Sequence, residues 1–264
     1  MPPTLPKPTP VTVSRRRFLG ALVPGLICWP LLVAGAAVNP HIIMEQMAKA
    51  YDPIHDYTAL FLKRERINGA LQQQEVIELR FQEPFKIYMA WREPYTGRIV
   101  TYVKGENDDK MLVNPGGLLG FVNLSLSPSS LLATRNSHHT ILEAGLQKTI
   151  DLIMRQYRRG MREGLVTLAF RGHDQVDERP AYHLEFICQA DKAAGYYAAR
   201  GEVWVDKEHY LPTRLHIYNW NNELYAAYEY HDLALNPGLG PEAFQMSAVP
   251  SPSPPLSPPA TTEP

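Results

Sequence analysis

Cysteine is scarce in this sequence, which has two in 264 residues. Cys28 lies in an apolar run near the N-terminus, and Cys188 lies in a segment that alternates like a strand. If export removes the N-terminal run, no internal disulfide is possible, and the fold must be stabilised by its hydrophobic core. A lone cysteine in a strand is typically a small buried apolar residue, so we do not predict a nucleophile at Cys188.

Net charge is also small, with 26 basic and 27 acidic residues. The balance differs along the chain, because residues 1–37 hold Lys7 and three arginines and no acid. The rest therefore carries 22 basic and 27 acidic residues. A domain of this kind lacks the basic field that nucleic acids require, and we expect no nucleic-acid partner.

Motifs of the common catalytic sites are missing. The sequence has no Gly-x-Ser-x-Gly, no phosphate-binding glycine loop and no Cys-His pair in a suitable context. The best acid-base candidates are His183 with Glu185 and Glu229 with His231, because residues two apart on a strand share a face. Such neighbours are also common on a solvated strand face. We therefore predict no catalytic residue, no metal and no cofactor, with a hydrolase as an alternative.

The one long apolar run covers residues 18–37, and it follows Ser14-Arg15-Arg16-Arg17-Phe18-Leu19. This segment resembles a twin-arginine export signal, and small residues end the run as a signal peptidase requires. The export residues are Arg15, Arg16, Phe18 and Leu19. We expect a protein that is periplasmic or otherwise exported, with residues 1–37 as its signal peptide; a retained membrane anchor is the alternative.

Residues 56–113 alternate in hydrophobicity as strands do. Within this stretch, Asn68-Gly69 is suited to a two-residue hairpin turn between residues 57–67 and 71–82. Pairing across that turn sets Leu60 opposite Ile77. The sequence therefore predicts long antiparallel strands here.

Two helices and a long flap interrupt the strands. Residues 40–51 predict a short amphipathic helix, and a capping box at Thr140-Ile141-Leu142-Glu143 begins a second helix over residues 140–159, with Gly160 as its stop. Between strands and helix, residues 114–136 are rich in Gly, Ser, Pro and Leu without a regular period. A segment so long and apolar is unusual as an exposed loop, so we predict a flap against the sheet.

Five more strands are predicted between residues 164 and 233, which brings the total to about ten. Sequential strands joined by short turns are antiparallel. The predicted fold is α+β: an open, unclosed antiparallel β-barrel with one main helix and a flap packed on its concave face, and a short N-terminal helix. We predict a single domain over residues 38–246. Residues 247–264, with 7 prolines in 18 residues, are predicted to be a disordered tail.

Three segments resemble the exported bacterial family called domain of unknown function 1571. They are Phe61-Leu62-Lys63-Arg64-Glu65-Arg66-Ile67-Asn68-Gly69, Glu83-Pro84-Phe85-Lys86-Ile87-Tyr88-Met89 and Tyr102-Val103-Lys104-Gly105-Glu106-Asn107-Asp108-Asp109-Lys110. The match spans roughly residues 42–246. The order of elements, with the strand starts at Glu83-Pro84 and Leu211-Pro212, also resembles the periplasmic LolA/LolB-type lipoprotein-carrier fold. These resemblances imply an exported open barrel around a hydrophobic cavity, and no chemistry.

One helix can hardly cover the concave face of a ten-stranded sheet, so part of that face is predicted to form an apolar cleft with few charges. The candidate ligand-binding residues are Phe85, Ile87, Met89, Trp91 and Tyr228. Ordinary sheet packing is the alternative role of these residues. The sequence favours a non-catalytic envelope protein that binds a lipid, acyl chain or lipoprotein segment as carrier or sensor, with peripheral membrane contact as a further expectation. A protein-protein scaffold of the envelope is the main alternative.

Overall fold

A computed structural model describes residues 38–246 of the chain. The export residues Arg15, Arg16, Phe18 and Leu19 and the proline-rich tail lie outside the described residues. The helices and short 3₁₀ turns are α1 (Pro40–Met47), η1 (Asn107–Asp109), η2 (Gly117–Leu119), α2 (Leu131–Thr134), η3 (Ile141–Glu143), α3 (Leu146–Glu163), η4 (Lys192–Ala194) and η5 (Pro241–Phe244). The strands are β1 (Asp56–Ile67), β2 (Ala70–Leu71), β3 (Glu75–Gln82), β4 (Lys86–Glu93), β5 (Ile99–Val103), β6 (Met111–Asn114), β7 (Leu124–Leu126), β8 (Val166–Val176), β9 (Arg179–Cys188), β10 (Arg200–Asp206), β11 (Pro212–Tyr218) and β12 (Leu224–Leu235).

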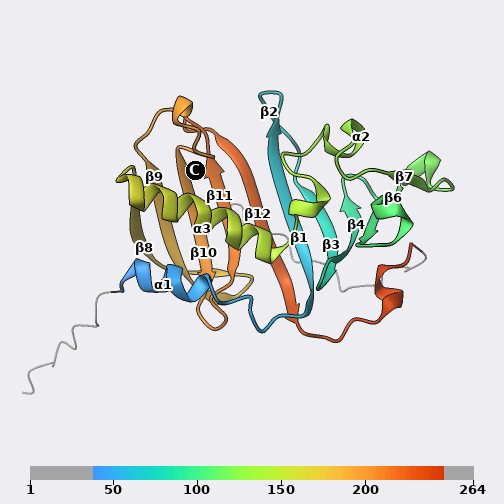
Figure 1. The fold of residues 1–264 in the computed structure, drawn as a ribbon, viewed down its shortest axis with the longest axis horizontal. Coiled ribbons are helices and arrows are strands. Elements are labelled where there is room, and N and C mark those ends of the chain that lie inside the picture. The colour runs from blue at the N-terminus through green and yellow to red at the C-terminus, as the bar shows by residue number, and fades with distance from the viewer. Residues whose placement is uncertain (1–37, 247–264) are drawn as a thin grey trace, which may run out of the picture. The chain divides into compact units, whose positions relative to one another are not determined.

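The strands form one antiparallel sheet of 12 strands in the order β7-β6-β5-β4-β3-β1-β12-β11-β10-β9-β8, with β2 beside β1 (Figure 1). Because β7 and β8 end this order without pairing to each other, the barrel is open, as predicted. The prediction of about ten strands missed β2 and β7. Each has two or three residues, which is too short to show a period of two.

In the first hairpin, the observed strand register differs by one residue from the predicted register. The turn at Asn68-Gly69 forms as predicted, because Ile67 pairs with Ala70 across it. In the main ladder, however, Phe61 and not Leu60 lies opposite Ile77. Residues 72–74 lie outside the strands and shift the register, so the predicted Leu60–Ile77 pair is wrong.

The main helix is displaced from its predicted bounds. The capping box at Thr140 is present, but it closes the short η3 turn, and α3 runs from Leu146 to Glu163. Gly160 therefore does not stop the helix. It lies inside α3, where it packs against Val166 of β8. A Cβ atom at this position would lie 2.2 Å from Cγ2 of Val166, so only glycine lets the helix approach β8 this closely. Gly164, in the left-handed conformation, ends the helix.

We expect Gly160→Ala to lower the free energy of unfolding by about 1–3 kcal/mol, because the added methyl overpacks the contact with Val166. Helix propensity alone predicts the opposite, a gain of about 1 kcal/mol. Urea unfolding measures the sign. Adding Val166→Ala removes the Cγ2 atom but leaves Cβ at 2.4 Å, so partial recovery is expected. A more stable Gly160→Ala protein would show that this contact is not tight.

Helix α3 covers only one half of the concave face. Its buried residues Ile150, Ile153, Met154 and Tyr157 face the sheet, and Figure 1 shows α3 lying across the β8–β12 half. Tyr57 of β1 ties the start of this helix to the sheet, because its hydroxyl accepts a hydrogen bond from the Leu146 amide at 3.0 Å. The half formed by β3–β6 is not covered by α3, and side chains of the flap lie near it.

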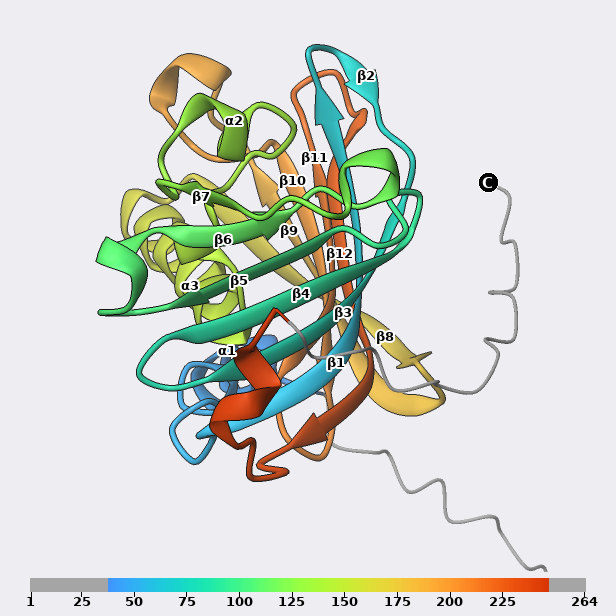
Figure 2. The same cartoon turned by 90° about the vertical axis from the view of Figure 1, so that its right-hand side faces the viewer.

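The opposite face of β4 is covered by the C-terminal segment, which the sequence did not predict. Phe244 of η5 packs with Tyr88 and Ala90, and the Thr101 hydroxyl donates a hydrogen bond to the Phe244 carbonyl at 2.6 Å. At the other end, the buried Asp56 carboxylate accepts hydrogen bonds from the amides of residues 238 and 239. Figure 2 shows this segment against the outer side of the sheet. Strand β4 is therefore buried on both faces.

Candidate ligand-binding cleft

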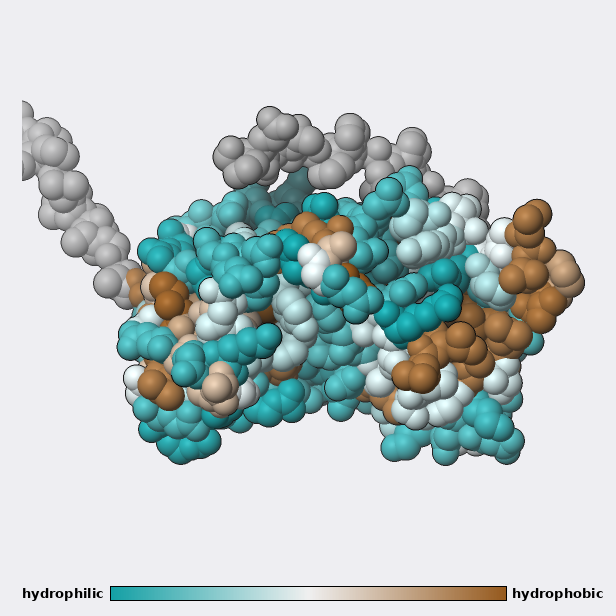
Figure 3. All heavy atoms as spheres, turned by 90° about the horizontal axis from the view of Figure 1, so that it is seen from above, coloured by the Kyte–Doolittle hydropathy of each residue, from teal (hydrophilic) through white to brown (hydrophobic). Residues whose placement is uncertain are grey.

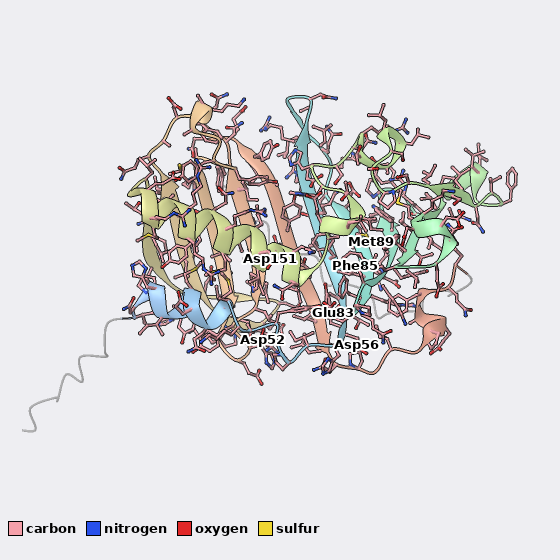
Figure 4. All side chains as sticks on the ribbon, viewed as in Figure 1. Asp52, Asp56, Glu83, Phe85, Met89 and Asp151 are labelled. Atoms are coloured by element: carbon pink, nitrogen blue, oxygen red, sulfur yellow. The ribbon has the colours of Figure 1, made fainter. Side chains whose placement is uncertain are left out.

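The half of the sheet that α3 leaves uncovered carries a cleft of about 500 Å³. Its walls come from the inner face of the sheet, from the flap, and from η3 with the first turns of α3. Figure 4 labels Met89 on the sheet and Asp151 on α3, which line the cleft from these two sides. Small-molecule sites typically have volumes of about 300–1,000 Å³, so the cleft is large enough for a ligand of that size.

The predicted candidate residues are divided between this cleft and the core beneath it. Met89, Trp91 and Tyr228 line the cleft, because alternation along β4 and β12 turns these side chains to the concave face. Phe85 and Ile87 share that face and are buried, but they do not line the cleft. Phe85 packs edge to face on Phe81 at 5.2 Å between ring centroids. The structure thus brings Met89, Trp91 and Tyr228 to one surface and leaves Phe85 and Ile87 in the core.

Trp91 lies between the apolar side chains and the charged side chains that line the cleft. Its indole N–H donates a hydrogen bond to the Glu75 carboxylate on the neighbouring strand. The Arg98 guanidinium lies over the Tyr95 ring at 3.9 Å and over the Trp91 ring at 5.6 Å. Burial lowers the pKa of Arg98, and nearby Arg135 lowers it further while Glu75 opposes the shift. A positive charge therefore stands at the edge of an apolar surface.

The prediction of few charges in the cleft is wrong. Apolar side chains line it from the sheet and flap: Met89, Val100, Met111, Val113, Leu124, Leu126 and Leu132. Charged side chains line it as well: Lys63, Glu65, Glu75, Arg98, Arg135, Glu143, Lys148, Asp151 and Arg155. The cleft is therefore suited to a ligand with both apolar and polar parts.

Glu65 is the buried carboxylate at the inner end of the cleft, 2% exposed. Its oxygens accept hydrogen bonds from the Tyr228 hydroxyl at 2.5 Å and from the His138 amide at 3.2 Å, and Lys63 lies 3.3 Å away. Burial raises the pKa of Glu65, but the Lys63 charge and the Tyr228 hydrogen bond outweigh it, so the pKa is lowered. Glu65 therefore ties the segment before α3 to β1 and β12.

Lys63 and Glu65 were not among the predicted site residues. The alternation of β1 could have identified them, because Lys63 and Glu65 lie two and four residues after the inward-facing Phe61 and so share its face of the strand. The contribution of Arg135 had no such signal, since the flap has no regular period.

We expect Glu65→Gln to lower the free energy of unfolding by about 1–3 kcal/mol at pH 7, because a charged acceptor is lost from two hydrogen bonds and an ion pair. Since the folded pKa lies below the unfolded one, the contribution is present above the unfolded pKa and is lost as pH falls through the folded pKa. The difference from wild type should therefore shrink in acid. Chemical denaturation between pH 7 and pH 3 measures it.

Glu93→Gln, at an exposed carboxylate on β4, is the matched control and should change stability little at any pH. A Glu65→Gln deficit that stays the same from pH 7 to pH 3 would contradict the ionised state assigned to Glu65.

The predicted acid-base pairs lie on the convex face, away from the cleft. His231 and Glu229 are 3.0 Å apart, and Arg214 lies 2.9 Å from the same carboxylate. Burial raises the pKa of Glu229, but hydrogen bonds from His216 and His231 and the Arg214 charge hold it well below its usual range. Such a carboxylate is ionised and fully paired, as in a structural ion-pair network.

The second pair, His183 and Glu185, is also engaged by other partners on the convex face. The His183 ring stacks on Trp204 at 4.2 Å between centroids, while Glu185 is paired with Arg171 and with Arg200. Residues 38–246 contain no group of three or more His, Cys, Asp or Glu side chains placed to hold a metal ion. Cys188 is a half-buried free thiol.

The structure is an open antiparallel barrel with one long helix on its concave face and a cleft beside that helix, which is the fold that the sequence predicted. A family model described as "Protein of unknown function (DUF1571)" matches residues 54–251, and the chain belongs to this family. No curated protein matches the sequence. Within residues 38–246, no helix is both long enough and apolar enough to cross a membrane.

Several solved structures are similar in fold. The lipoprotein LppX from Mycobacterium tuberculosis is 12% identical, with 77% of this chain and 99% of that chain covered and a TM-score of 0.45. A chain of the Pseudomonas aeruginosa MucA/MucB complex is 15% identical, with 77% and 59% covered and a TM-score of 0.45, so this chain spans little more than half of its length. A LolA superfamily protein from Nitrosomonas europaea is 12% identical, with 79% and 98% covered and a TM-score of 0.32.

Proposed function

We propose that this chain is an exported, non-catalytic envelope protein that binds an apolar or amphipathic ligand in its cleft, as a carrier or sensor. The ligand is a lipid, an acyl chain or a lipoprotein segment. Residues 1–37 act as the export signal, residues 38–246 as the binding domain and residues 247–264 as a tail.

One observation carries the proposal: beyond the part of the sheet on which α3 packs, apolar side chains of the sheet face a cleft. Met89, Trp91 and Met111 line a cleft of about 500 Å³ instead of packing beneath α3. Apolar surface of this kind is stabilised by about 25 cal/mol for each Å² that a ligand removes from water. Arg98 and Arg135 at the same cleft favour a ligand whose polar end is negatively charged.

The scaffold alternative has its own observation, the exposed leucines of the flap, which also fit a protein partner. The hydrolase alternative has less support. His183 and His231 are packed into ring stacking and ion pairs on the convex face, whereas the cleft is on the concave face.

Native mass spectrometry of the full chain purified from its own host tests the proposal. We expect a bound small molecule that is lost on denaturation and identified as a lipid or an acylated peptide after solvent extraction. The same chain refolded without lipid is the control. A chain that captures a protein partner and no small ligand supports the scaffold, and a chain without any bound molecule overturns the carrier proposal.

A further inference from the structure

The flap presents a group of large apolar side chains to solvent. Leu118 is 95% exposed, Phe121 84% and Leu131 86%, and Leu119 is exposed beside them. These four residues are here called the apolar tip. Figure 3 shows a continuous brown area over the end of the molecule that carries the flap. Single exposed leucines are common on soluble proteins, but a group of this size marks a surface that meets another apolar phase.

The turn that carries Leu118, Leu119 and Phe121 is held by specific hydrogen bonds. The Asn114 side chain donates to the Gly120 carbonyl at 2.7 Å and to Asn123 at 3.0 Å, and it accepts from the Gly116 amide at 2.9 Å. Gly116 is buried against the β4–β5 turn, where a Cβ atom would lie 2.6 Å from the Arg98 amide nitrogen. The exposure of Leu118 and Phe121 is therefore built into a fixed turn.

The charge around the tip selects a partner. From Lys110 to Leu142 the chain has no aspartate or glutamate, although the sequence after residue 37 is acidic overall. The cations of the flap and its neighbouring turns are Arg135 after α2, Arg98, whose turn packs on Gly116, and Lys110, which lies 3.6 Å from the Asp108 carboxylate. A surface with apolar projections and basic neighbours is complementary to a bilayer with anionic headgroups.

We propose that the apolar tip inserts into the surface of an anionic lipid bilayer. The side chains project from η2, from the turn after it and from α2, and a fluid acyl layer accepts such projections without a shaped counterpart. Leu124 and Leu132, which follow Phe121 and Leu131 in the chain, are both exposed and also line the cleft, so apolar side chains of the flap face both the tip and the cleft. This arrangement gives a cleft ligand a route between bilayer and protein, a consequence that rests on the proposed function.

A local depth measurement separates this contact from any contribution of the apolar residues 18–37. The full chain with Phe121→Trp is mixed with vesicles of phosphatidylethanolamine and phosphatidylglycerol that carry brominated acyl chains. Trp emission is compared with that of the wild-type chain, whose own indoles provide the background. We expect the added indole to be quenched at a depth of roughly 5–10 Å below the headgroup boundary. Vesicles of phosphatidylcholine alone should bind less, because the basic neighbours lose their counter-charge.

Met161→Trp is the matched control, because Met161 is an exposed apolar residue of α3 outside the flap. Its added indole should show no extra quenching. The proposal is overturned if the Phe121→Trp indole stays unquenched on vesicle-bound protein, or if the chain does not bind vesicles. It is also overturned if sedimentation shows that the chain is a dimer and that Leu118→Ser and Phe121→Ser dissociate it. None of these outcomes depends on a ligand in the cleft, so they leave the carrier proposal to the mass-spectrometry result.

Discussion

Trp91→Asp protein purified from its own host is expected to be folded but to carry no bound ligand. The carboxylate would replace an indole at the floor of the cleft, where a ligand that covered it would have to remove a charge from water. Desolvating an unpaired charge costs several kcal/mol, so binding should fall at least about 100-fold. The substitution also removes the donor to Glu75 and adds a like charge beside it. Native mass spectrometry measures the bound fraction, and circular dichroism checks the fold.

Trp91→Phe is the matched control, because it keeps an aromatic apolar surface and loses only the hydrogen bond to Glu75. We expect it to retain most of the ligand. A folded Trp91→Asp protein with wild-type ligand content would remove Trp91 from the binding surface. Equal loss in both variants would assign the effect to the Glu75 contact rather than to apolar burial.

Phe244→Ala is expected to lower the free energy of unfolding by about 3–5 kcal/mol, because it empties a buried aromatic site. Phe244 is 4% exposed and packs on the outer face of β4 with Tyr88 and Ala90. Loss of this contact uncovers the back of the strand whose front bears Met89 and Trp91. Urea unfolding followed by circular dichroism measures the change.

Truncation after Gln245 gives the contrasting control. It retains Phe244 and removes Met246 and the proline-rich tail, which the sequence predicts to have nothing to bury, so the thermal midpoint should not change. Glu242→Ala, at an exposed position of the same η5 turn, should likewise have little effect. A large loss of stability on truncation would move the domain boundary into the tail, and a Phe244→Ala change below about 1 kcal/mol would show that the C-terminal segment contributes little to the fold.

The cleft was only partly predictable from the sequence. Period-two alternation identified the inward face of β4, and with it Met89 and Trp91. Alternation does not show which inward side chains line the cleft, so Phe85 and Ile87 could not be told apart from them. Which part of the concave face stays open depends on where α3 lies, and that position depends on its contacts with distant strands.

Local signals were determined by the sequence itself. The turn at Asn68-Gly69, the capping box at Thr140 and the alternating strands all form, because each depends on backbone preferences and neighbours within a few residues. The open antiparallel fold follows from the order of these elements and their short connections.

Only the tertiary structure decided the features that require contact between distant residues. The displacement of Leu60 from Ile77 arises because β1 pairs with β2 next to the turn and with β3 further on, and residues 72–74 lie outside both ladders. From the sequence alone, Gly160 is typical of a helix end. In the fold it packs closely against Val166, and the helix continues past it. The flap has no period to predict, and Leu118 and Phe121 face solvent because Asn114 and Gly116 hold their turn on the β4–β5 connection.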